Sequence, residues 1–319
     1  MRGYASIAAA FCALTLAACG GSKVLTLGTR KPKIVAGPEL VELPVPAGEE
    51  GNNISNATLT DDMLEIVFSS NWIIRTAKRA SIHDRFDGAV VVLPASDSLT
   101  KRTSPAISPD GRTLWFASKP DDSHDYDVWV SQRSSRALDW PAAVRSDSLS
   151  TPGNDLPRPL GNHGLVLPLS VYHTDITGKA FEIFFANRGS ISDDFAPPVA
   201  ALDLPHPPGG SATDPFLTDD GLHLFYSDQS NGNPGDIVLA EHDAWGHPFD
   251  RGEPVEGVNT TDWKEGDPWL SADGKTLYFT SHRIVSLDGG AIGDGGTNSG
   301  NYAYLDRIYR VEFDVPWMP

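Results

Sequence analysis

The sequence predicts an all-β chain that folds as a five-bladed β-propeller, closed by an N-terminal strand that completes the last blade. Three observations predict this fold. One hairpin-like segment recurs three times in register. Two weaker copies bring the number of units to five, and the last unit ends without its fourth strand while a matching segment stands near the N-terminus. Self-similarity of this kind is typical of repeat architectures.

The three strong copies each predict two strands joined by a tight turn. They read SPAISPDGRTLWFAS (104–118), TDPFLTDDGLHLFYS (213–227) and GDPWLSADGKTLYFTS (266–281). Asp-Gly supplies the positive φ angles that such a hairpin needs. After a loop, a third strand is predicted at DVWVSQR (127–133), DIVLAEH (236–242) and DRIYRVE (306–312). A fourth strand follows an aromatic residue and a proline.

The two weaker copies are recognised by position more than by identity. In the unit from Asn154, the turn is predicted at residues 162–164 and the third strand at EIFFANR (182–188). In the unit from Asn56, the turn is predicted at Asp61-Asp62 and the third strand at GAVVVLP (88–94). With unit starts near 56, 104, 156, 214 and 267, the sequence predicts five blades.

The fourth strand of the last blade is expected from the other end of the chain. Residues 38–53, PELVELPVPAGEEGNN, are similar to the fourth strands predicted at 253–266 and 197–210. Pairing both chain ends would close the ring, and loss of residues 38–50 should destabilise the domain. Units that cannot cover their own apolar faces favour radial packing, with an open β-solenoid as the alternative.

The repeat resembles that of the TolB-like, WD-related propeller family, whose mark is an S-P-D-G-x-x-L-x-F-x-S hairpin. The resemblance covers nearly all of residues 54–314. It implies an interaction scaffold and does not identify the partner. The α/β domain that TolB carries is not expected here, so a TolB-type translocation role is not implied.

The N-terminus resembles a bacterial lipoprotein signal. Arg2 precedes an apolar run over residues 5–18, too short to span a bilayer, and Leu16-Ala17-Ala18-Cys19 resembles a lipobox. We expect a signal peptide at 1–18, lipid on Cys19, a tether at 19–37 and the propeller at 38–319. The alternative is an ordinary secretory signal. Gly20 favours an outer-membrane lipoprotein, facing the periplasm or the exterior, in a Gram-negative host.

The net charge and the cysteine content limit the classes of partner that the protein is expected to bind. With 25 Lys and Arg against 42 Asp and Glu, the net charge is −17, which disfavours nucleic acid. Membrane contact is expected only through the lipid. Both cysteines lie in the first 19 residues, so the mature domain is expected to have no disulfide. A monomer that binds an envelope protein or a glycan is expected.

One face of the ring is the better candidate for a site. The starts of the innermost strands should place polar side chains around the channel rim. These candidate binding residues are Asn56, Asp155, Arg158, Asp214 and Asp267, with Ser104 at the matching position. Three carboxylates there would suit a cation or sugar hydroxyls. Alternatively, Asp214 and Asp267 stand before prolines only because Asp-Pro suits a turn into a strand.

The same face should carry the long connections at 119–125, 228–235 and 282–305, whereas the Asp-Gly side should have little room for a site. The candidate loop-face residues are Asp122, Asp125, Asp228, His282 and Arg283. No cofactor is expected. The acidic cluster at 121–127 lacks EF-hand spacing, so calcium stays only an alternative, and no zinc or nucleophile motif is present.

The sequence leaves three functions open. The first is a non-catalytic scaffold that binds a protein or a glycan. The second is a glycan-active enzyme that uses the rim carboxylates, for which a carboxyl pair about 5–10 Å apart is needed. The third is an architectural role in envelope assembly. We favour the first, partly because the TolB-like resemblance implies an interaction scaffold, and we assign no catalytic residues.

Overall fold

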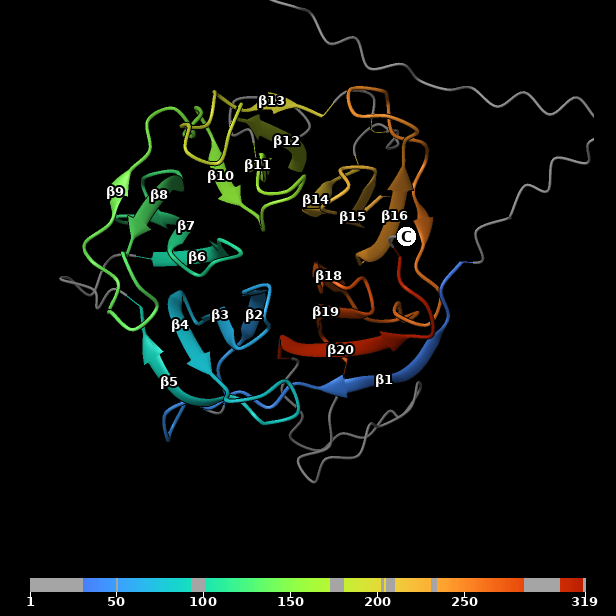
Figure 1. Ribbon diagram of the computed structural model, residues 1–319, viewed down its shortest axis with the longest axis horizontal. Helices are drawn as coiled ribbons and strands as arrows, with labels where there is room; N and C mark the ends of the chain where they lie inside the picture. Colours follow the sequence, from blue (N-terminus) through green and yellow to red (C-terminus); the bar gives the residue numbers. More distant parts are fainter. Residues whose placement is uncertain are drawn as a thin grey trace, which may run out of the picture. The chain divides into compact units, whose positions relative to one another are not determined.

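The computed structural model describes residues 31–49, 51–92, 101–172, 181–201, 204, 210–230, 234–283 and 305–317. Residues 32–319 form one compact unit. The predicted signal peptide, Cys12 and Cys19 lie outside the described residues. Within the described ranges, twenty strands form five four-stranded sheets and there is no helix, hence none that could cross a membrane. The sheets stand around a central axis as the blades of a propeller (Figure 1).

The blades follow one another along the chain, each with its innermost strand first. Blade 1 consists of β2 (Ile54–Leu59), β3 (Glu65–Ser70), β4 (Ile73–Lys78) and β5 (Asp87–Val91). Blade 2 consists of β6 (Lys101–Ile107), β7 (Thr113–Lys119), β8 (Asp127–Gln132) and β9 (Val144–Arg145). Blade 3 consists of β10 (Asn154–Pro157), β11 (Val166–Tyr172), β12 (Phe181–Asn187) and β13 (Val199–Ala200).

Blade 4 consists of β14 (Ala212–Leu217), β15 (His223–Asp228), β16 (Asp236–Glu241) and β17 (Glu253–Pro254). Blade 5 combines both ends of the chain: β18 (Glu265–Leu270), β19 (Thr276–Ser281), β20 (Arg307–Phe313) and, outermost, β1 (Ile34–Leu40). The predicted closure by an N-terminal strand is confirmed. In Figure 1 the blue β1 lies beside the red β20. The strand spans residues 34–40, so it begins four residues before the segment 38–53 that the sequence predicted for it.

The repeated Ser-x-Asp-Gly sequence builds a hydrogen-bonded turn. In blade 2, the Ser108 hydroxyl donates to Asp110 (2.6 Å) and accepts from the Thr113 N–H (2.9 Å), while Gly111 has φ +71°. The same hydroxyl-to-carboxylate bond recurs in blade 4 (Thr218 to Asp220, 2.5 Å) and blade 5 (Ser271 to Asp273, 2.6 Å). The repeat therefore fixes the hairpin locally, before any blade packs on another.

The strand order of blade 1 corrects one prediction. Its third strand is β4, and the segment predicted as third, residues 88–94, contributes to the fourth strand β5. The cause is a two-residue turn at Asn71 and Trp72, with φ +49° and +66°, where the sequence led us to expect a loop. Two positive φ angles in a two-residue hairpin are typical of a type I′ turn.

Aromatic side chains fill the space between blades. The second strands carry Phe68, Phe116, Tyr226 and Phe279 at matching positions, all at most 2% exposed. Each large ring can cover a neighbouring sheet, which a single blade cannot do for itself. The propeller is therefore held together by apolar contacts that repeat around the axis.

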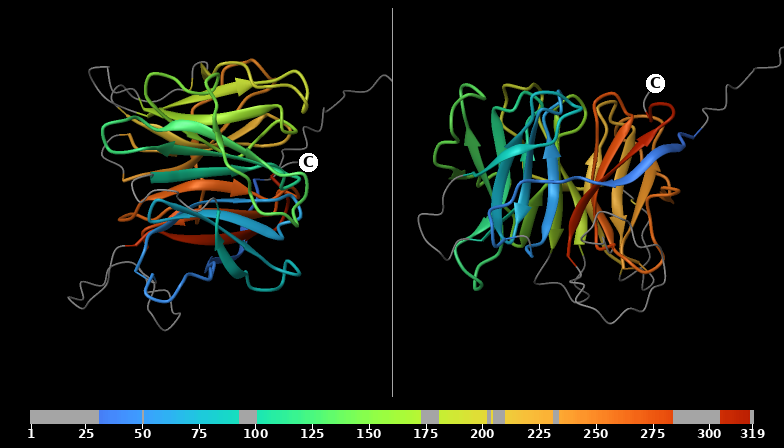
Figure 2. Two further views of the ribbon diagram at one scale, coloured as in Figure 1. Left: turned by 90° about the vertical axis from the view of Figure 1, so that its left-hand side faces the viewer. Right: turned by 90° about the horizontal axis from the view of Figure 1, so that it is seen from below.

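The strands run between two faces of the propeller, as the side views in Figure 2 show. The turn face carries the Asp-Gly turns and the connections between third and fourth strands. The mouth face carries the connections between second and third strands and the chain that enters each innermost strand. Because successive antiparallel strands reverse direction, this division holds for every blade.

Candidate functional site

Four of the five innermost strands bend at the same place on the mouth face. The residues there are in the left-handed region, with φ +56° at Asn56, +49° at Ser104, +58° at Asp214 and +52° at Asp267. Each bend coincides with an irregularity in the pairing with the second strand. Asn and Asp tolerate this conformation better than most residues, which explains why short polar side chains occupy the position.

The bent residues connect neighbouring blades by hydrogen bonds. The Asn56 N–H donates to Asp267 Oδ2 (3.1 Å), and the Asn56 side-chain oxygen accepts from the Ser104 N–H (3.2 Å) and the Thr103 hydroxyl (2.9 Å). The Asp214 N–H donates to the Ser170 hydroxyl (2.8 Å). These bonds join blade 5 to blade 1, blade 1 to blade 2 and blade 4 to blade 3.

Blade 3 departs from this pattern and supplies a cation instead. Strand β10 pairs with β11 without interruption up to Pro157, and the next residue, Arg158, is buried. Its guanidinium donates to Asp267 Oδ1 through Nη1 (2.7 Å) and to Asp214 Oδ1 through Nη2. All three side chains are at most 9% exposed. One arginine thus binds both channel carboxylates.

The two carboxylates differ in their proton affinity. Burial raises the pKa of Asp214 above its ordinary range, and the nearby Asp267 charge adds to this effect against the attraction of Arg158. Burial also acts on Asp267, but the charges of Arg158 and Lys264, with the hydrogen bond from the Asn56 N–H, lower its pKa. Opposite shifts in adjacent carboxyl groups are a pattern found in acid–base pairs.

A cavity of about 570 Å³ opens above this triad on the mouth face. We call it the mouth pocket. It is lined by side chains from all five blades, among them Asn56, Arg158, Asp214, Gln229, Lys264, Asp267 and His282. The volume lies within the range usual for small-molecule sites.

Aromatic side chains form part of its wall. Trp72 of blade 1 and Tyr126 of blade 2 lie nearly parallel, with ring centroids 6.2 Å apart and an interplanar angle of 22°. On blade 3, Tyr172 and Phe181 contact each other at 5.0 Å. An apolar wall beside a charged floor allows a ligand to bind through both ring faces and polar groups.

Asp155 does not lie where it was predicted. Counted back from the glycine of its turn, Pro157 and not Asp155 stands at the position of Asn56, Ser104, Asp214 and Asp267. The Asp155 carboxylate is buried away from the mouth pocket, where it accepts from the Thr151 N–H (2.6 Å) and hydroxyl (2.8 Å). Burial raises its pKa to about 7, against the effect of these bonds.

The predicted loop-face residues are dispersed. Asp122 binds Lys101 (2.7 Å) and Lys119 (3.2 Å), Asp125 is exposed, and Asp228 accepts from the Ser230 N–H (2.9 Å). Only His282 lines the mouth pocket, where its ring pairs with Asp306. Residues 284–304 of the long connection lie outside the described residues.

The Arg283 side chain is occupied by contacts with neighbouring protein groups. Its guanidinium contacts the buried Glu265 carboxylate (3.2 Å), donates to the Val258 carbonyl (2.6 Å) and lies 5.0 Å from the centre of the Tyr309 ring. The side chain is therefore held within blade 5 and does not line the mouth pocket. Among the described residues, no group of three or more His, Cys, Asp or Glu side chains is placed to hold a metal ion.

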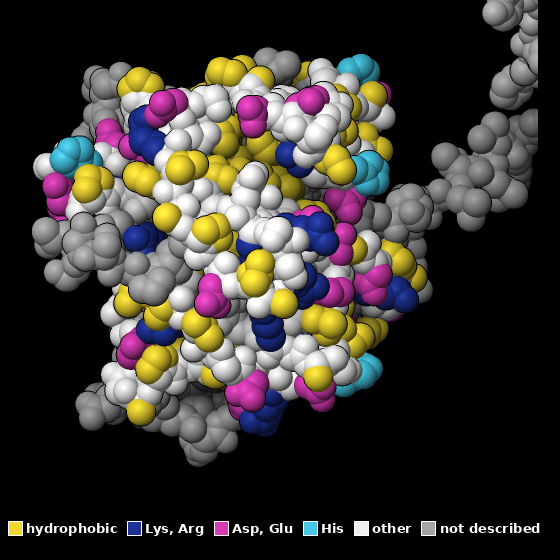
Figure 3. All heavy atoms as spheres, turned by 60° about the vertical axis from the view of Figure 1, so that its left-hand side comes forward, with side chains coloured by type: hydrophobic (Ala, Val, Ile, Leu, Met, Phe, Trp, Pro, Cys, Tyr) yellow, Lys and Arg dark blue, Asp and Glu magenta, His cyan; other side chains and the backbone are white. Residues whose placement is uncertain are grey.

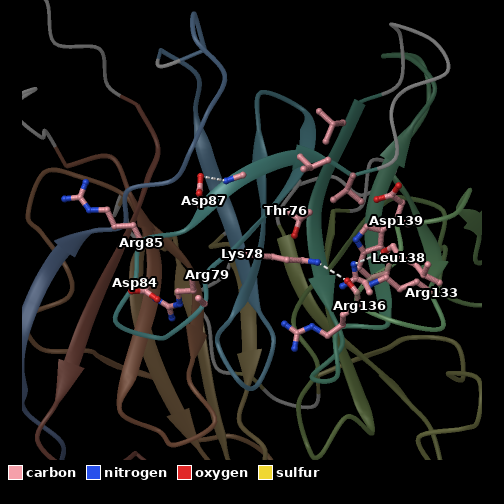
Figure 4. A pocket seen from close by; sticks show the side chains of 17 residues that line it. Thr76, Lys78, Arg79, Asp84, Arg85, Asp87, Arg133, Arg136, Leu138 and Asp139 are labelled. Atoms are coloured by element: carbon pink, nitrogen blue, oxygen red, sulfur yellow. Dashed lines mark hydrogen bonds between the residues drawn. The ribbon is translucent and has the colours of Figure 1, made fainter.

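The turn face has more room than the sequence led us to expect. A groove of about 790 Å³ lies between blades 1 and 2, lined by residues of β5 and of the connections at 79–86 and 133–143 (Figure 4). Lys78 reaches across it to the Arg136 carbonyl (2.9 Å). Figure 3, which brings the side of β5 and β9 forward, shows Lys and Arg side chains gathered next to acidic and hydrophobic ones.

The charges of this groove are largely compensated. Arg133 binds the buried Glu65 (2.7 Å), Arg136 binds Asp62 and the same Glu65, and Arg85 binds Glu42. The contacts of Arg133 and Arg136 fasten blade 2 to blade 1. The mouth pocket, where polar groups from five blades meet, is therefore the stronger candidate site.

Sequence reasoning missed the aromatic wall and two polar lining residues. Trp72, Tyr126, Tyr172 and Phe181 stand at strand ends outside the repeated motif, and Gln229 and Lys264 lie in connections. One signal was present: an Asn followed by a bulky residue between two apolar strands, at positions 71 and 72, marks a turn of unusual composition.

No family model and no curated protein sequence matches this chain. Solved structures do. The α-L-arabinofuranosidase PaAbf62A from Podospora anserina superimposes with a TM-score of 0.53 at 12% identity, covering 87% of this chain and 95% of that one. A protein of unknown function from Dyadobacter fermentans gives 0.50 at 11%, covering 87% and 97%. TolB from Agrobacterium tumefaciens gives 0.48 at 13%, covering 83% and 91%.

The neighbours of this structure are thus TolB and other β-propeller proteins. Identities this low show the fold alone. The class of protein is defined: a five-bladed β-propeller with four-stranded blades, closed by both chain ends.

Proposed function

We propose that the chain is a non-catalytic binding module of the bacterial cell envelope that takes its ligand into the mouth pocket. One observation carries the proposal: both carboxylates on the pocket floor bind the same buried guanidinium, that of Arg158. A glycosidase needs one carboxyl group to transfer a proton and a second to act as nucleophile or base. Because both carboxylates are bound to Arg158, a structural role as the polar floor of the pocket is favoured over a catalytic role.

The N-terminal strand supports an envelope role. A lipid on Cys19, as the N-terminal sequence predicts, would anchor the chain ahead of β1. Strand β1 begins opposite Phe313, at the turn face, because β20 runs from the mouth face to the turn face. The anchored chain would therefore join the propeller on the side away from the mouth pocket, leaving that pocket open to a ligand.

Blocking the mouth pocket tests the proposal. In a Cys12→Ser, Cys19→Ser background, Gln229→Cys would place a thiol on the pocket wall, and a bulky maleimide would then plug the pocket. Val199→Cys, 59% exposed on β13 and outside the mouth pocket, is the matched control. Both labelled proteins are compared by calorimetry against soluble oligosaccharides and envelope-derived peptides.

The expected result is a ligand whose binding the plug at 229 abolishes and the label at 199 leaves intact. A ligand that binds both labelled proteins equally well would contradict the proposal, as would a panel in which nothing binds the unlabelled protein.

The second candidate is a glycan-active enzyme. The observation that favours it is the opposite pKa shift of Asp214 and Asp267 within one pocket. Hydrolysis of aryl glycosides or polysaccharides by the purified protein, lost in both Asp214→Asn and Asp267→Asn, would support this candidate. Ligand binding without turnover would instead support the binding module.

A further inference from the structure

Trp72 adopts a backbone conformation that suits glycine. It is the second residue of the two-residue turn between β3 and β4, where Asn-Gly is the favoured pair, and its φ is +66°. A bulky residue in this region is an outlier. The residue is 52% exposed, so burial in the core does not explain the choice. Strain at a residue that lies outside the core, on the edge of a pocket, points to a role at a binding site.

The ring of Trp72 lies at the edge of the mouth pocket beside an aromatic and a cationic neighbour. It is nearly parallel to Tyr126, and the Lys101 ammonium lies 5.6 Å from its centre. The Lys119 ammonium lies 4.8 Å from the Tyr126 ring, and Asp122 binds both lysines. Neighbours that already contact the two rings reduce the conformational entropy that is lost when a ligand covers them.

Two polar side chains on the same pocket are free to bind a ligand. Neither the Gln229 amide nor the Lys264 ammonium has a hydrogen bond or ion pair among the described residues, and both line the pocket. Gln229 offers a donor and an acceptor, and Lys264 offers three donors. The pocket therefore combines flat apolar faces with unpaired hydrogen-bonding groups.

We propose that the mouth pocket binds a carbohydrate, with a sugar ring packed on Trp72 and its hydroxyls bonded by Gln229 and Lys264. This inference rests on the proposed function and names its ligand class. A sugar ring has apolar faces and a polar edge, which match the wall and the unpaired groups. A lipid chain would leave Lys264 and Gln229 desolvated without partners. A protein interface would need a far larger area than this pocket offers.

The test uses the full chain and four neutral hexasaccharides as probes: cellohexaose, xylohexaose, chitohexaose and maltohexaose. Affinity is measured by calorimetry for the wild type, Trp72→Gly and Trp245→Ala. Trp245 is the matched control because it is also exposed (44%) and lies outside the mouth pocket. Trp72→Asn is a second variant, since Asn tolerates positive φ while lacking the ring.

We expect at least one hexasaccharide to bind the wild type and Trp245→Ala equally well. Affinity should fall at least about tenfold in Trp72→Gly and Trp72→Asn, as for an anchoring aromatic residue. The melting temperature of Trp72→Gly should not fall, because glycine relieves the strain of the turn. A merely structural Trp72 would lower the melting temperature and leave the affinity unchanged.

Two results overturn the inference: no hexasaccharide binds, or the two Trp72 variants bind as the wild type does. The plug at residue 229 separates this failure from that of the proposed function. If the plug abolishes sugar binding that survives loss of Trp72, the binding module stands and the role of Trp72 falls. If sugar binding survives the plug, both fall.

Discussion

Ile34 lies opposite Phe313 in the pairing of β1 with β20, so the two ends of the domain share one sheet. This pair begins the register that runs on to Leu40 opposite Tyr309. Phe313 is buried, and Ile34 packs against the apolar core that blades 4, 5 and 1 share. Because this pairing closes the ring, the stability of the whole propeller should depend on β1.

Gly37→Ala tests how far stability depends on β1, because it adds a single Cβ atom to this strand. A Cβ on Gly37 would lie 2.5 Å from the Arg310 carbonyl oxygen, and its φ is +95°. Alanine should lower the free energy of unfolding by about 2 kcal/mol or more, through backbone strain and the displaced strand. Urea unfolding followed by circular dichroism measures it.

Gly48→Ala is the matched control for strain alone, since Gly48 has φ +89° and a Cβ added there would meet no atom within 4 Å. Gly48→Ala should lower the free energy of unfolding by only about 1 kcal/mol. Equal losses in both variants would mean that the approach of β1 to β20 contributes nothing.

Arg158 should be the most sensitive residue of the channel. Arg158→Met leaves Asp214 and Asp267 as adjacent buried carboxylates without their cation. Removing one partner of a buried ion pair typically costs about 3–5 kcal/mol. The triple variant Arg158→Met, Asp214→Asn, Asp267→Asn should recover much of the loss, measured by urea unfolding.

Arg145→Met removes an exposed arginine, paired with Asp127 at 2.8 Å, and should cost less than about 1 kcal/mol. If Arg158→Met were no more damaging than this control, the triad would not be a stabilising element of the channel.

The blades could be predicted from sequence because their determinants are local. The Ser108 to Asp110 bond and the positive φ of Gly111 act within four residues, so each hairpin is encoded in its own repeat. The closing strand could be predicted by counting strands, because the last blade lacked one and the N-terminal segment offered one more. Blade 1 was misassigned because its two-residue turn contains Trp72 in place of the usual glycine.

The site depended on contacts that no local pattern encodes. Asp214 and Asp267 were predicted at the rim, but their shared bond to Arg158 arises because β10 lacks the bend of the other innermost strands. For the same reason Asp155 lies away from the pocket. The approach of Trp72 to Tyr126 depends on how two blades pack, which repeat spacing does not determine.

Asp155 should give the protein a pH-dependent stability. Its folded pKa, raised to about 7 by burial, exceeds its ordinary value of 3.8. The folded state therefore holds a proton that the unfolded state releases, and this contribution to stability falls as the pH rises from about 4 to 7, then stays constant. The change is at most about 4 kcal/mol.

Asp155→Asn cannot ionise and lacks this contribution. We expect the free energy of unfolding of the wild type, measured in urea, to fall relative to that of the variant as the pH rises from 4 to 7. A difference that is constant over this range would show that the buried carboxyl group does not titrate there.

His282 should act in the same direction as Asp155 and at higher pH. Its ring pairs with Asp306 at the base of the long connection, and this hydrogen bond raises the His282 pKa above 6.5 despite partial burial. A histidine with a raised folded pKa stabilises the folded state fully below the unfolded pKa, and the contribution is lost as the pH rises through the folded pKa.

The wild type should therefore be more stable than His282→Gln at low pH, and this advantage should shrink as the pH rises through the raised folded pKa. Unfolding in urea at about pH 5.5 and about pH 8.5 measures the difference. Asp306→Asn removes the other partner and should give the same pH dependence. Because His282 lines the mouth pocket, the affinity for any ligand bound there should be compared at both pH values in the same variants. The free energy of unfolding of the two variants could differ from that of the wild type by the same amount at pH 5.5 and at pH 8.5. The His282–Asp306 pair would then contribute packing and no titratable charge. In that case the mouth pocket would not respond to pH through His282.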